Sequence, residues 1–263
     1  MPKLAANLSM MFTERGFLDR FEAAAACGFR GVEYLFPYDF DAADIARALR
    51  EHKLENALFN FPPGDWDNGE RGLAGVPGRE ADFRASVDLA LDYAGVLGCK
   101  TLHVMYGFAP QGADPNDCEA LFIDNLRMAA KRAQAQSITL LMEPLNSRDM
   151  PGYPLLSQRQ AHDLVAKIGV SNVQVQFDFY HCQIMEGDVA MKIREFLGGF
   201  GHVQIAGVPE RHEPNIGEVN YTYLLDVLDQ VGYDAWVGCE YRPIAGTEAG
   251  LGWAEPYGIR APS

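Results

Sequence analysis

The stretch ITLLMEPLN, residues 138–146, is an apolar run that ends in a carboxylate, Glu143. A loop follows, and then the segment SQRQAHDLVAKIG (157–169) repeats its apolar residues with the period of a helix. A short buried strand that leads into a helix is the unit from which parallel sheets are built. We therefore predict that residues 138–143 form one strand of a parallel sheet, with Glu143 at its carboxyl end.

Strands and helices alternate in the same way along the whole chain. The β-prone runs lie at residues 4–8, 31–34, 56–61, 101–105, 138–143, 173–178, 202–205 and 236–240. Helical segments follow them; several end at glycine, and the last, 247–253, is short. Connections into the strands are tight, whereas several connections out of them are long. The pattern predicts an α/β protein with a single (β/α)8 TIM barrel over residues 1–263, whose chemistry lies at the carboxyl ends of the strands.

Composition limits the partners of the protein. The chain is 48% hydrophobic and 22% charged, with a formal net charge of −14, which argues against binding to nucleic acid or to anionic membranes. No GxGxxG or Walker loop follows a strand, so a nucleotide-binding open sheet has no support. The sequence shows no apolar run of transmembrane length and no signal-peptide core. We expect a soluble, cytoplasmic protein that acts on a small molecule, with a homo-oligomer left open. The five cysteines lack CxxC spacing and are expected to be reduced thiols: Cys27, Cys99, Cys118, Cys182 and Cys239.

Polar residues recur on one side of the predicted strands. The stretch VQVQFDFYH (173–181) alternates with period two, which places Gln174, Gln176 and Asp178 on the same face. In a half-exposed antiparallel strand such residues would simply face water, and this is the commoner explanation for one strand alone. In a barrel strand covered by helices, they must instead point toward the barrel axis. Buried polar groups there need partners.

Four successive strands place an oxygen-bearing side chain near their carboxyl ends: Glu143, Asp178, Gln204 and Glu240. Neighbouring parallel strands lie about 4.8 Å apart, so these groups can converge. Three converging carboxylates would take up protons unless a cation lay among them. Hard oxygen donors favour Mg²⁺ or Mn²⁺ over zinc, and we predict that these four residues bind such a metal. Helix capping by Glu143 is disfavoured, because Pro144 follows it and the next helix begins much later.

Longer motifs make the chain resemble a known family. They include CGFRGVEYLFPYDF, PPGDWDNGERG, LLMEPLN, QFDFYHCQIMEG, GHVQIAGVPERHEPNIGEVNY and WVGCEYRP. The sequence resembles, almost end to end, the hydroxypyruvate isomerases of the xylose-isomerase-like barrel superfamily of metal-dependent sugar isomerases and epimerases. The resemblance implies that Glu143, Asp178, Gln204 and Glu240 bind a divalent metal, and that Glu143 and Glu240 exchange the substrate proton. Related epimerases commonly carry histidine where Gln204 stands, which favours a small keto acid over a hexose.

The implied reaction converts hydroxypyruvate to tartronate semialdehyde through an enediolate. An isomerase or epimerase of a four-carbon oxo acid or a neutral ketose is the alternative. A metal-dependent phosphoester hydrolase would want a histidine-rich zinc site and a basic face, which six scattered histidines and a charge of −14 do not favour. A non-catalytic binding barrel would leave the two glutamates unexplained.

Four further residues are candidates for contact with the substrate, each with an alternative. His181 is expected to reach a substrate oxygen or to hold a neighbouring side chain. Arg211 and Arg71 are expected to bind a substrate carboxylate, although either could be a solvated loop residue. For His103 the expectation is divided between a pocket wall and a hydrogen-bonded core histidine, with the core position favoured. Two other polar residues, Asn7 and Glu33, are expected to stabilise the barrel, and the loop at 61–72 could close over the substrate.

Overall fold

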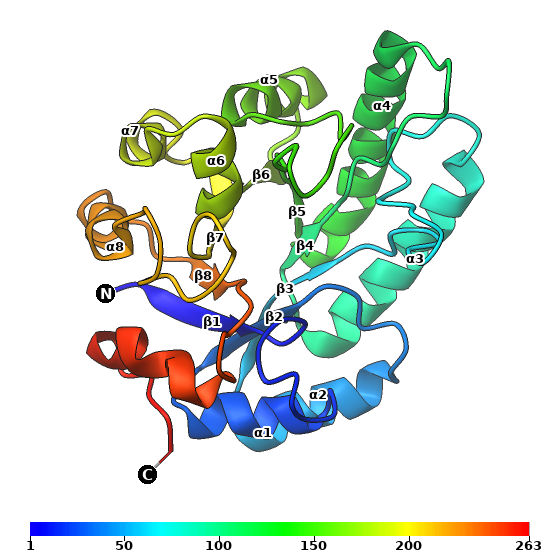
Figure 1. Ribbon diagram of the computed structural model, residues 1–263. Helices are drawn as coiled ribbons and strands as arrows, with labels where there is room; N and C mark the ends of the chain where they lie inside the picture. Colours follow the sequence, from blue (N-terminus) through cyan, green and yellow to red (C-terminus); the bar gives the residue numbers. More distant parts are fainter. Residues whose placement is uncertain (263) are drawn as a thin grey trace.

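The computed structural model describes residues 1–262 and shows a closed barrel of eight strands, all paired in parallel in the order in which they occur along the chain (Figure 1). The predicted (β/α)8 TIM barrel is therefore confirmed. The strands are β1 (Lys3–Asn7), β2 (Gly31–Tyr34), β3 (Glu55–Asn60), β4 (Thr101–His103), β5 (Thr139–Met142), β6 (Val173–Asp178), β7 (Phe200–Ile205) and β8 (Trp236–Cys239).

Helices surround the strands on the outside of the barrel (Figure 1). They are α1 (Asp19–Ala26), α2 (Ala42–His52), α3 (Glu80–Leu97), α4 (Pro115–Ala133), α5 (Gln158–Ile168), α6 (Phe179–Met185), α7 (Val189–Glu195) and α8 (Tyr221–Gln230), with 3-10 helices η1 (Gln134–Gln136) and η2 (Glu248–Tyr257). Helix α2 illustrates how the sequence sets an element. The Asp41 side chain caps its first turn by accepting from the Ala43 N–H at 2.8 Å, and Ile45 and Leu49 bury one face.

Several strand ends differ from the prediction by one or two residues, and two helices differ more. Helix α6, which the sequence analysis does not identify, begins directly after β6, because Asp178 ends the strand and also caps the helix: its Oδ1 accepts from the Tyr180 N–H at 2.7 Å. The last helix is longer than the predicted 247–253 and has the tighter 3-10 form, with Pro256 inside it. All five cysteines are buried free thiols, as predicted.

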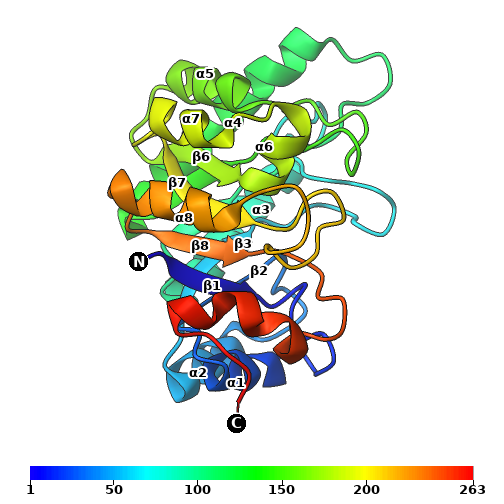
Figure 2. The same ribbon diagram turned by 60° about the vertical axis from the view of Figure 1, so that its left-hand side comes forward.

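The long loops collect at one end of the barrel. In Figure 2 the strand arrows point toward the right-hand side of the view, and the loops that leave the strands extend from that side. They include the loop between β3 and α3 and the loop between β7 and α8. In residues 1–262, no helix combines the length and the apolar character needed to cross a membrane.

Candidate active site

A cavity of about 130 Å³ opens at the carboxyl ends of the strands. Part of its wall is apolar and includes Met10, Leu35, Trp66, Met105, Leu145 and Met150. The polar part of the wall is formed by Asn60, His103, Glu143, Asp149, His181, Arg211, Glu240 and Arg242. A small polar molecule that enters this cavity therefore meets the ends of β3, β4, β5 and β8 together.

Glu143, Asp178 and His181 form a tight buried group at the base of the site. Each offers one ligand-type atom, and these atoms lie within 4.8 Å of one another. Glu143 follows β5, and Asp178 is the last residue of β6. Glu143 Oε1 and Asp178 Oδ2 are buried and have no hydrogen-bond partner among residues 1–262. Buried polar atoms are rarely left without partners, so this pair marks a place where a further group belongs.

Arg211 and Glu240 close the other side of the cavity. Arg211 Nη2 lies 2.5 Å from Glu240 Oε2 and 3.6 Å from Asp178 Oδ2. The Arg211 backbone is left-handed, with φ at 60°, and this conformation belongs to the loop between β7 and α8. The second Glu240 oxygen, Oε1, accepts from Asn7 Nδ2 at 3.2 Å. Glu240 is thus held from two sides, whereas Glu143 is not.

Burial and mutual repulsion control the charges of these groups. Burial raises the pKa of Glu240 to about 8 and that of Asp178 to about 6, although Arg211 opposes both shifts. The pKa of Glu143 is also raised, by burial and by the facing carboxylates of Glu240 and Asp178. Burial acts to lower the pKa of Arg211, but the carboxylates outweigh it and raise that pKa, so the guanidinium stays charged.

The predicted metal ligands are partly brought together. Asp178 and Glu240 both lie near the Arg211 guanidinium, and Glu143 lies beside Asp178, although Asp178 itself does not line the cavity. Gln204 pairs with Asp178 in the β6–β7 register, but its Oε1 accepts from Gln176 Nε2 at 2.6 Å and its Nε2 donates to Glu33 at 2.7 Å. Gln204 is not among the residues that line the cavity. Its role as a ligand stays a prediction.

The donor set fits a divalent cation. When ionised, Glu143, Asp178 and Glu240 carry three negative charges and Arg211 carries one positive charge. The two remaining negative charges match one divalent ion. The free oxygens of Glu143 and Asp178 are hard donors of the kind that Mg²⁺ and Mn²⁺ prefer. Glu143 and Asp178 would hold the ion, and Glu240 and Gln204 are the further candidate ligands.

His181 faces this group with a defined tautomer. The Asn146 backbone N–H donates to His181 Nδ1 at 3.0 Å, so the proton of the neutral ring is on Nε2. Nε2 lies 3.6 Å from Asp178 Oδ2. Burial and the nearby Arg211 lower the pKa of His181 well below its usual value, which keeps the ring neutral. His181 is therefore suited to donate a hydrogen bond to a substrate oxygen.

His103 corrects one expectation. The sequence favours a hydrogen-bonded core histidine, but neither ring nitrogen has a hydrogen-bond partner within residues 1–262, and the ring lines the cavity. His103 Nδ1 lies 3.7 Å from Glu143 Oε2. Burial lowers the pKa of His103 to about 3, so it is a neutral part of the cavity wall. The reason for the difference is that His103 is the last residue of β4, so its buried side chain lies at the strand end, where it borders the cavity.

Arg71 lies behind the cavity wall and does not line it. Its guanidinium carbon is 3.7 Å from the centroid of the Trp66 ring, and its Nη1 donates to the Trp66 and Glu70 carbonyl oxygens. Trp66 itself lines the cavity. In this arrangement Arg71 braces the loop at 61–72 and packs against Trp66, which borders the site.

Three polar residues of the site were not identified from the sequence: Asn60, Asp149 and Arg242. Asn60 ends β3, so the rule that located Glu143 applies to it as well. Arg242 follows Glu240 by two residues, which is a usable signal, because alternate residues of an extended segment face the same side. Asp149 lies in a long loop, and its position depends on contacts with Asn146 and Tyr180. No periodicity in the sequence points to it.

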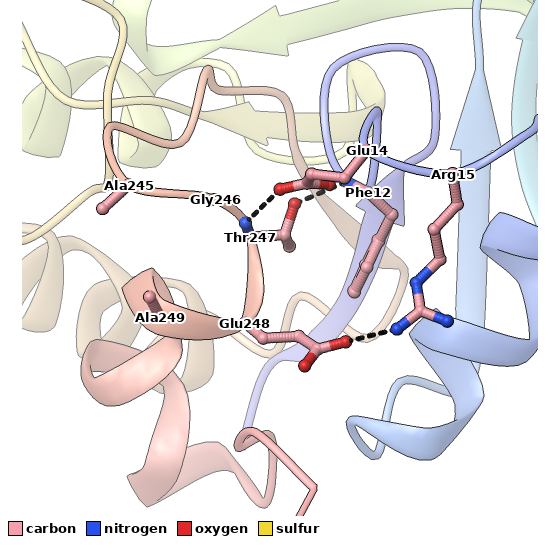
Figure 3. A pocket seen from close by; sticks show the side chains of 8 residues that line it. All are labelled: Phe12, Glu14, Arg15, Ala245, Gly246, Thr247, Glu248 and Ala249. Carbon is pink, nitrogen blue, oxygen red and sulfur yellow. Dashed lines mark hydrogen bonds and ion pairs between the residues drawn. The ribbon is translucent and has the colours of Figure 1, made fainter.

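A second cavity, of about 370 Å³, lies between the loops that follow β1 and β8 (Figure 3). Its polar groups are paired. Glu14 accepts from the Thr247 N–H at 2.8 Å, the Thr247 hydroxyl accepts from the Phe12 N–H at 2.5 Å, and Arg15 lies 2.9 Å from Glu248 (Figure 3). These contacts join the first and last loops of the barrel.

Comparison with known proteins places the chain in a family. The model of the xylose isomerase-like TIM barrel family matches residues 21–257. A 2-oxo-tetronate isomerase of Cupriavidus necator is 58% identical over 98% of this chain and 99% of that protein. The hydroxypyruvate isomerase of Escherichia coli is 47% identical over 98% of this chain and 100% of that protein.

Solved structures agree on the fold. A protein described as an AP endonuclease, family 2, from Brucella melitensis has a TM-score of 0.96 and 56% identity, with 98% of this chain and 99% of that chain covered. A 3-keto-D-glucoside 4-epimerase from Escherichia coli has a TM-score of 0.77 at 20% identity, over 97% of this chain and 100% of that chain, which is a likeness of fold alone. The chain therefore belongs to the xylose isomerase-like TIM barrel family.

Proposed function

We propose that the protein is a metal-dependent isomerase of small 2-oxo acids, which converts hydroxypyruvate to tartronate semialdehyde by proton transfer through an enediolate. The observation that carries this proposal is the pair of glutamates, Glu143 and Glu240, at one small cavity beside buried carboxylate oxygens that find no hydrogen-bond partner among residues 1–262. The relatives named hydroxypyruvate isomerase and 2-oxo-tetronate isomerase support an isomerase of small oxo acids. The metal and the specific reaction belong to the proposal.

The two glutamates are placed to move the substrate proton. They follow β5 and β8, which stand nearly opposite one another in the ring of eight strands. In this reaction a proton leaves C3 and a proton arrives at C2. One glutamate would accept the first, and the other would deliver the second; general acid–base catalysis of this kind contributes about 10²–10⁴-fold. A bound divalent ion would polarise the substrate carbonyl and stabilise the negative charge that develops on its oxygens.

Other cavity residues bind and orient the substrate. His181 donates from Nε2, as its tautomer dictates, and is suited to a carbonyl or hydroxyl oxygen. Arg211 holds Glu240 in place and is itself neutralised by the carboxylates around it. The substrate carboxylate therefore requires a further positive charge. Arg242 lines the same cavity, and its guanidinium has no ion-pair partner in the described part of the chain, so we assign this role to Arg242.

A four-carbon substrate is the second candidate. The relative at 58% identity is named 2-oxo-tetronate isomerase, and so are relatives from Pectobacterium atrosepticum at 48% and Haemophilus influenzae at 46%. A 2-oxo-tetronate has the same oxo group at C2 and hydroxyl at C3 as hydroxypyruvate, with one more hydroxymethyl carbon. The same proton transfer between C3 and C2 would yield the 3-oxo isomer. The same residues would therefore serve both substrates.

Deuterium incorporation tests the proposal directly. Metal-loaded protein is incubated in D₂O with hydroxypyruvate or with 2-oxo-tetronate, and NMR follows the carbon-bound protons. We expect deuterium at C2 of the product or at C3 of the recovered substrate, beyond the exchange in a control without protein. Product formed without any label would instead indicate direct hydride transfer between the carbons. No turnover of either acid would contradict the proposed function. Cleavage of DNA at abasic sites, measured in parallel, would support the hydrolase alternative.

A further inference from the structure

Glu33 is a fully buried carboxylate inside the barrel that the proposed reaction does not use. It lies on β2, and its Oε1 accepts hydrogen bonds from two amides, Asn7 Nδ2 at 3.0 Å and Gln204 Nε2 at 2.7 Å. His202 Nε2 lies 2.6 Å from its other oxygen. The side chain thus joins β1, β2 and β7 beneath the cavity. Burying a carboxylate at this place costs free energy, which the hydrogen bonds must offset. The contacts of Glu33 with the residues of the cavity above it therefore suggest a role in that site.

The barrel provides space for this carboxylate through a glycine. Gly238 on β8 pairs in register with Gln204 on β7. A Cβ atom at position 238 would overlap both carboxylate oxygens of Glu33. Gly238 does not have a left-handed backbone, so glycine is required there for close approach and not for chain conformation. The interior of β8 is left open at this point, and the Glu33 carboxylate fills it.

Glu33 determines which way the Gln204 amide faces. Because a carboxylate accepts hydrogen bonds, the Gln204 group that faces it is the NH₂, and the Gln204 oxygen then faces the other way. Gln176 enforces the same orientation from the opposite side, since its Nε2 donates to Gln204 Oε1 at 2.6 Å. A carboxamide oxygen has two lone pairs, so one remains for a cation. The reverse orientation would present an N–H, which cannot bind a cation.

The same carboxylate also acts on Glu240 through Asn7. Asn7 Nδ2 donates to Glu33 at 3.0 Å and to Glu240 Oε1 at 3.2 Å, while Asn7 Oδ1 accepts from the Ser9 N–H at 3.0 Å. The amide of Asn7 is therefore fixed in one orientation and bridges the two carboxylates. Displacement of Glu33 would release one of the two contacts that fix Asn7 Nδ2, and with it the tether of Glu240.

We infer that Glu33 is a positioning residue for the metal site: it turns the Gln204 oxygen toward the cation and, through Asn7, holds Glu240 in place. The inference rests on the proposed function, because it presumes that Gln204 and Glu240 serve a bound divalent ion. A purely structural Glu33 would change the stability of the barrel and leave the affinity for metal as it was. Groups that hydrogen-bond metal ligands typically change metal affinity about 10- to 100-fold when they are removed.

Two substitutions disturb the Glu33 carboxylate in different ways: one removes it, and the other displaces it. Glu33→Leu takes away every acceptor, whereas Gly238→Ala keeps all the polar groups and displaces Glu33 by adding one methyl group. Glu33→Gln is the conservative variant: its oxygen still accepts from Asn7 and Gln204, and its new NH₂ donates to His202 Nε2 once the neutral imidazole carries its proton on Nδ1 instead. Gly201→Ala, also on a barrel strand, is the matched control, since the atoms nearest to its Cβ would belong to the Gln174 side chain and, less closely, to Leu141.

The readout is the Kd for Mn²⁺, from the EPR signal of the free ion, with circular dichroism and thermal melting in excess EDTA for every variant. We expect Glu33→Leu and Gly238→Ala to raise the Kd about 10- to 100-fold, and Glu33→Gln and Gly201→Ala to keep most of the affinity. Gly238→Ala decides the question if Glu33→Leu does not fold.

Three other results would overturn the inference, and they are distinguishable. If wild-type protein binds Mn²⁺ and the folded variants bind it as tightly, Glu33 does not position the site, while the proposed function stands. If Gly201→Ala weakens binding as much as Gly238→Ala, the effect comes from general disturbance of the barrel. If the wild-type protein itself binds no Mn²⁺, the metal site fails, and the inference fails with it.

Discussion

Two of the cavities at the carboxyl ends of the strands differ in how their charges are satisfied. The cavity between Phe12 and Thr247 is the larger, at about 370 Å³ against about 130 Å³, yet Arg15 pairs with Glu248 and Glu14 binds the Thr247 N–H (Figure 3). The smaller cavity contains buried polar atoms that have no hydrogen-bond partner in the described part of the chain, among them Glu143 Oε1. Because such atoms are costly, their concentration identifies a site better than volume does. The contrast can be tested by changing residues in each of the two cavities.

Metal removal should have the largest effect. Three carboxylates that face one arginine need a further cation, so chelation should abolish turnover, and Mg²⁺ or Mn²⁺ should restore it. The measurement is the rate of hydroxypyruvate conversion before and after treatment with EDTA and reconstitution. The metal-free protein should remain folded by circular dichroism, because the hydrophobic core surrounds the barrel independently of the cation. Full activity in rigorously metal-free protein would remove the distinction between the two cavities.

The Glu240→Gln substitution should have the second largest effect on turnover. The substitution keeps a neutral oxygen but removes the proton carrier, so kcat should fall by at least about 100-fold while some metal still binds. Glu248→Gln, in the other cavity, is the matched control and should leave kcat unchanged. A Glu240→Gln enzyme near the wild-type rate would show that the assigned role is wrong.

The next largest effects should distinguish the two arginines of the smaller cavity, because their substitution should change different kinetic constants. Arg242→Met should raise KM for hydroxypyruvate by about 10- to 150-fold, since a hydrogen bond to a charged group contributes roughly 1.5–3 kcal/mol. Dihydroxyacetone, a neutral analogue without the carboxylate, should be nearly indifferent to this change.

Arg211→Met should instead lower kcat for both compounds, because Arg211 holds Glu240. The measurement is the pair of kinetic constants for each compound and each variant. If Arg211→Met selectively impairs the acid, then Arg211 and not Arg242 binds the substrate carboxylate. That outcome would restore the role that the sequence suggests for Arg211.

The pH dependence of stability offers a finer contrast. The pKa of Glu240 is raised to about 8 and that of Asp178 to about 6, mainly by burial, from ordinary values of 4.5 and 3.8. The native metal-free protein therefore holds more protons than the unfolded chain between these limits. Its free energy of unfolding must decrease as pH rises through that window.

Melting curves of metal-free protein from pH 5 to pH 8 test this sign. Tm should fall over the range, and it should fall less in Glu240→Gln, which cannot titrate at that position. Equal slopes for the two proteins would mean that Glu240 is not the group responsible. Saturating Mg²⁺ should reduce the fall, because a ligand that binds only the native state stabilises it.

The smallest effect is expected in the larger cavity. The Arg15–Glu248 pair is partly exposed, and exposed pairs contribute about 0–1 kcal/mol. Arg15→Gln should therefore shift Tm slightly and leave the kinetic constants unaltered. A marked loss of turnover would show that the larger cavity takes part in the reaction, and the contrast between the cavities would then fail.

Sequence reasoning located the barrel and the strand-end residues because both depend on local patterns. The period-two stretch 173–178 and the apolar run that ends at Glu143 each determine an element and place a carboxylate at its end. Helix α6 was missed because Asp178 is both the end of a strand and a helix cap. A local pattern does not show that double role.

The environment of Gln204 could not be predicted for a different reason. Its partner Glu33 is 171 residues away in the chain, and only closure of the barrel brings them together. Loop residues such as Asp149 reach the cavity through turns whose course depends on long-range contacts, for example the hydrogen bond that the Tyr180 hydroxyl donates to Asp149 at 2.9 Å. Patterns of period two or 3.6 carry no information about such contacts.

The absence of a side chain at Gly238 has a consequence for redesign of the enzyme by directed evolution. Any larger residue there would overlap Glu33, so libraries that vary the interior of β8 would have to vary position 33 at the same time. The apolar wall offers safer targets. Met10, Leu35 and Trp66 line the cavity from loops and make none of the hydrogen bonds described for Glu33. Mutagenesis aimed at a longer oxo acid should therefore begin at the rim and leave the barrel interior intact.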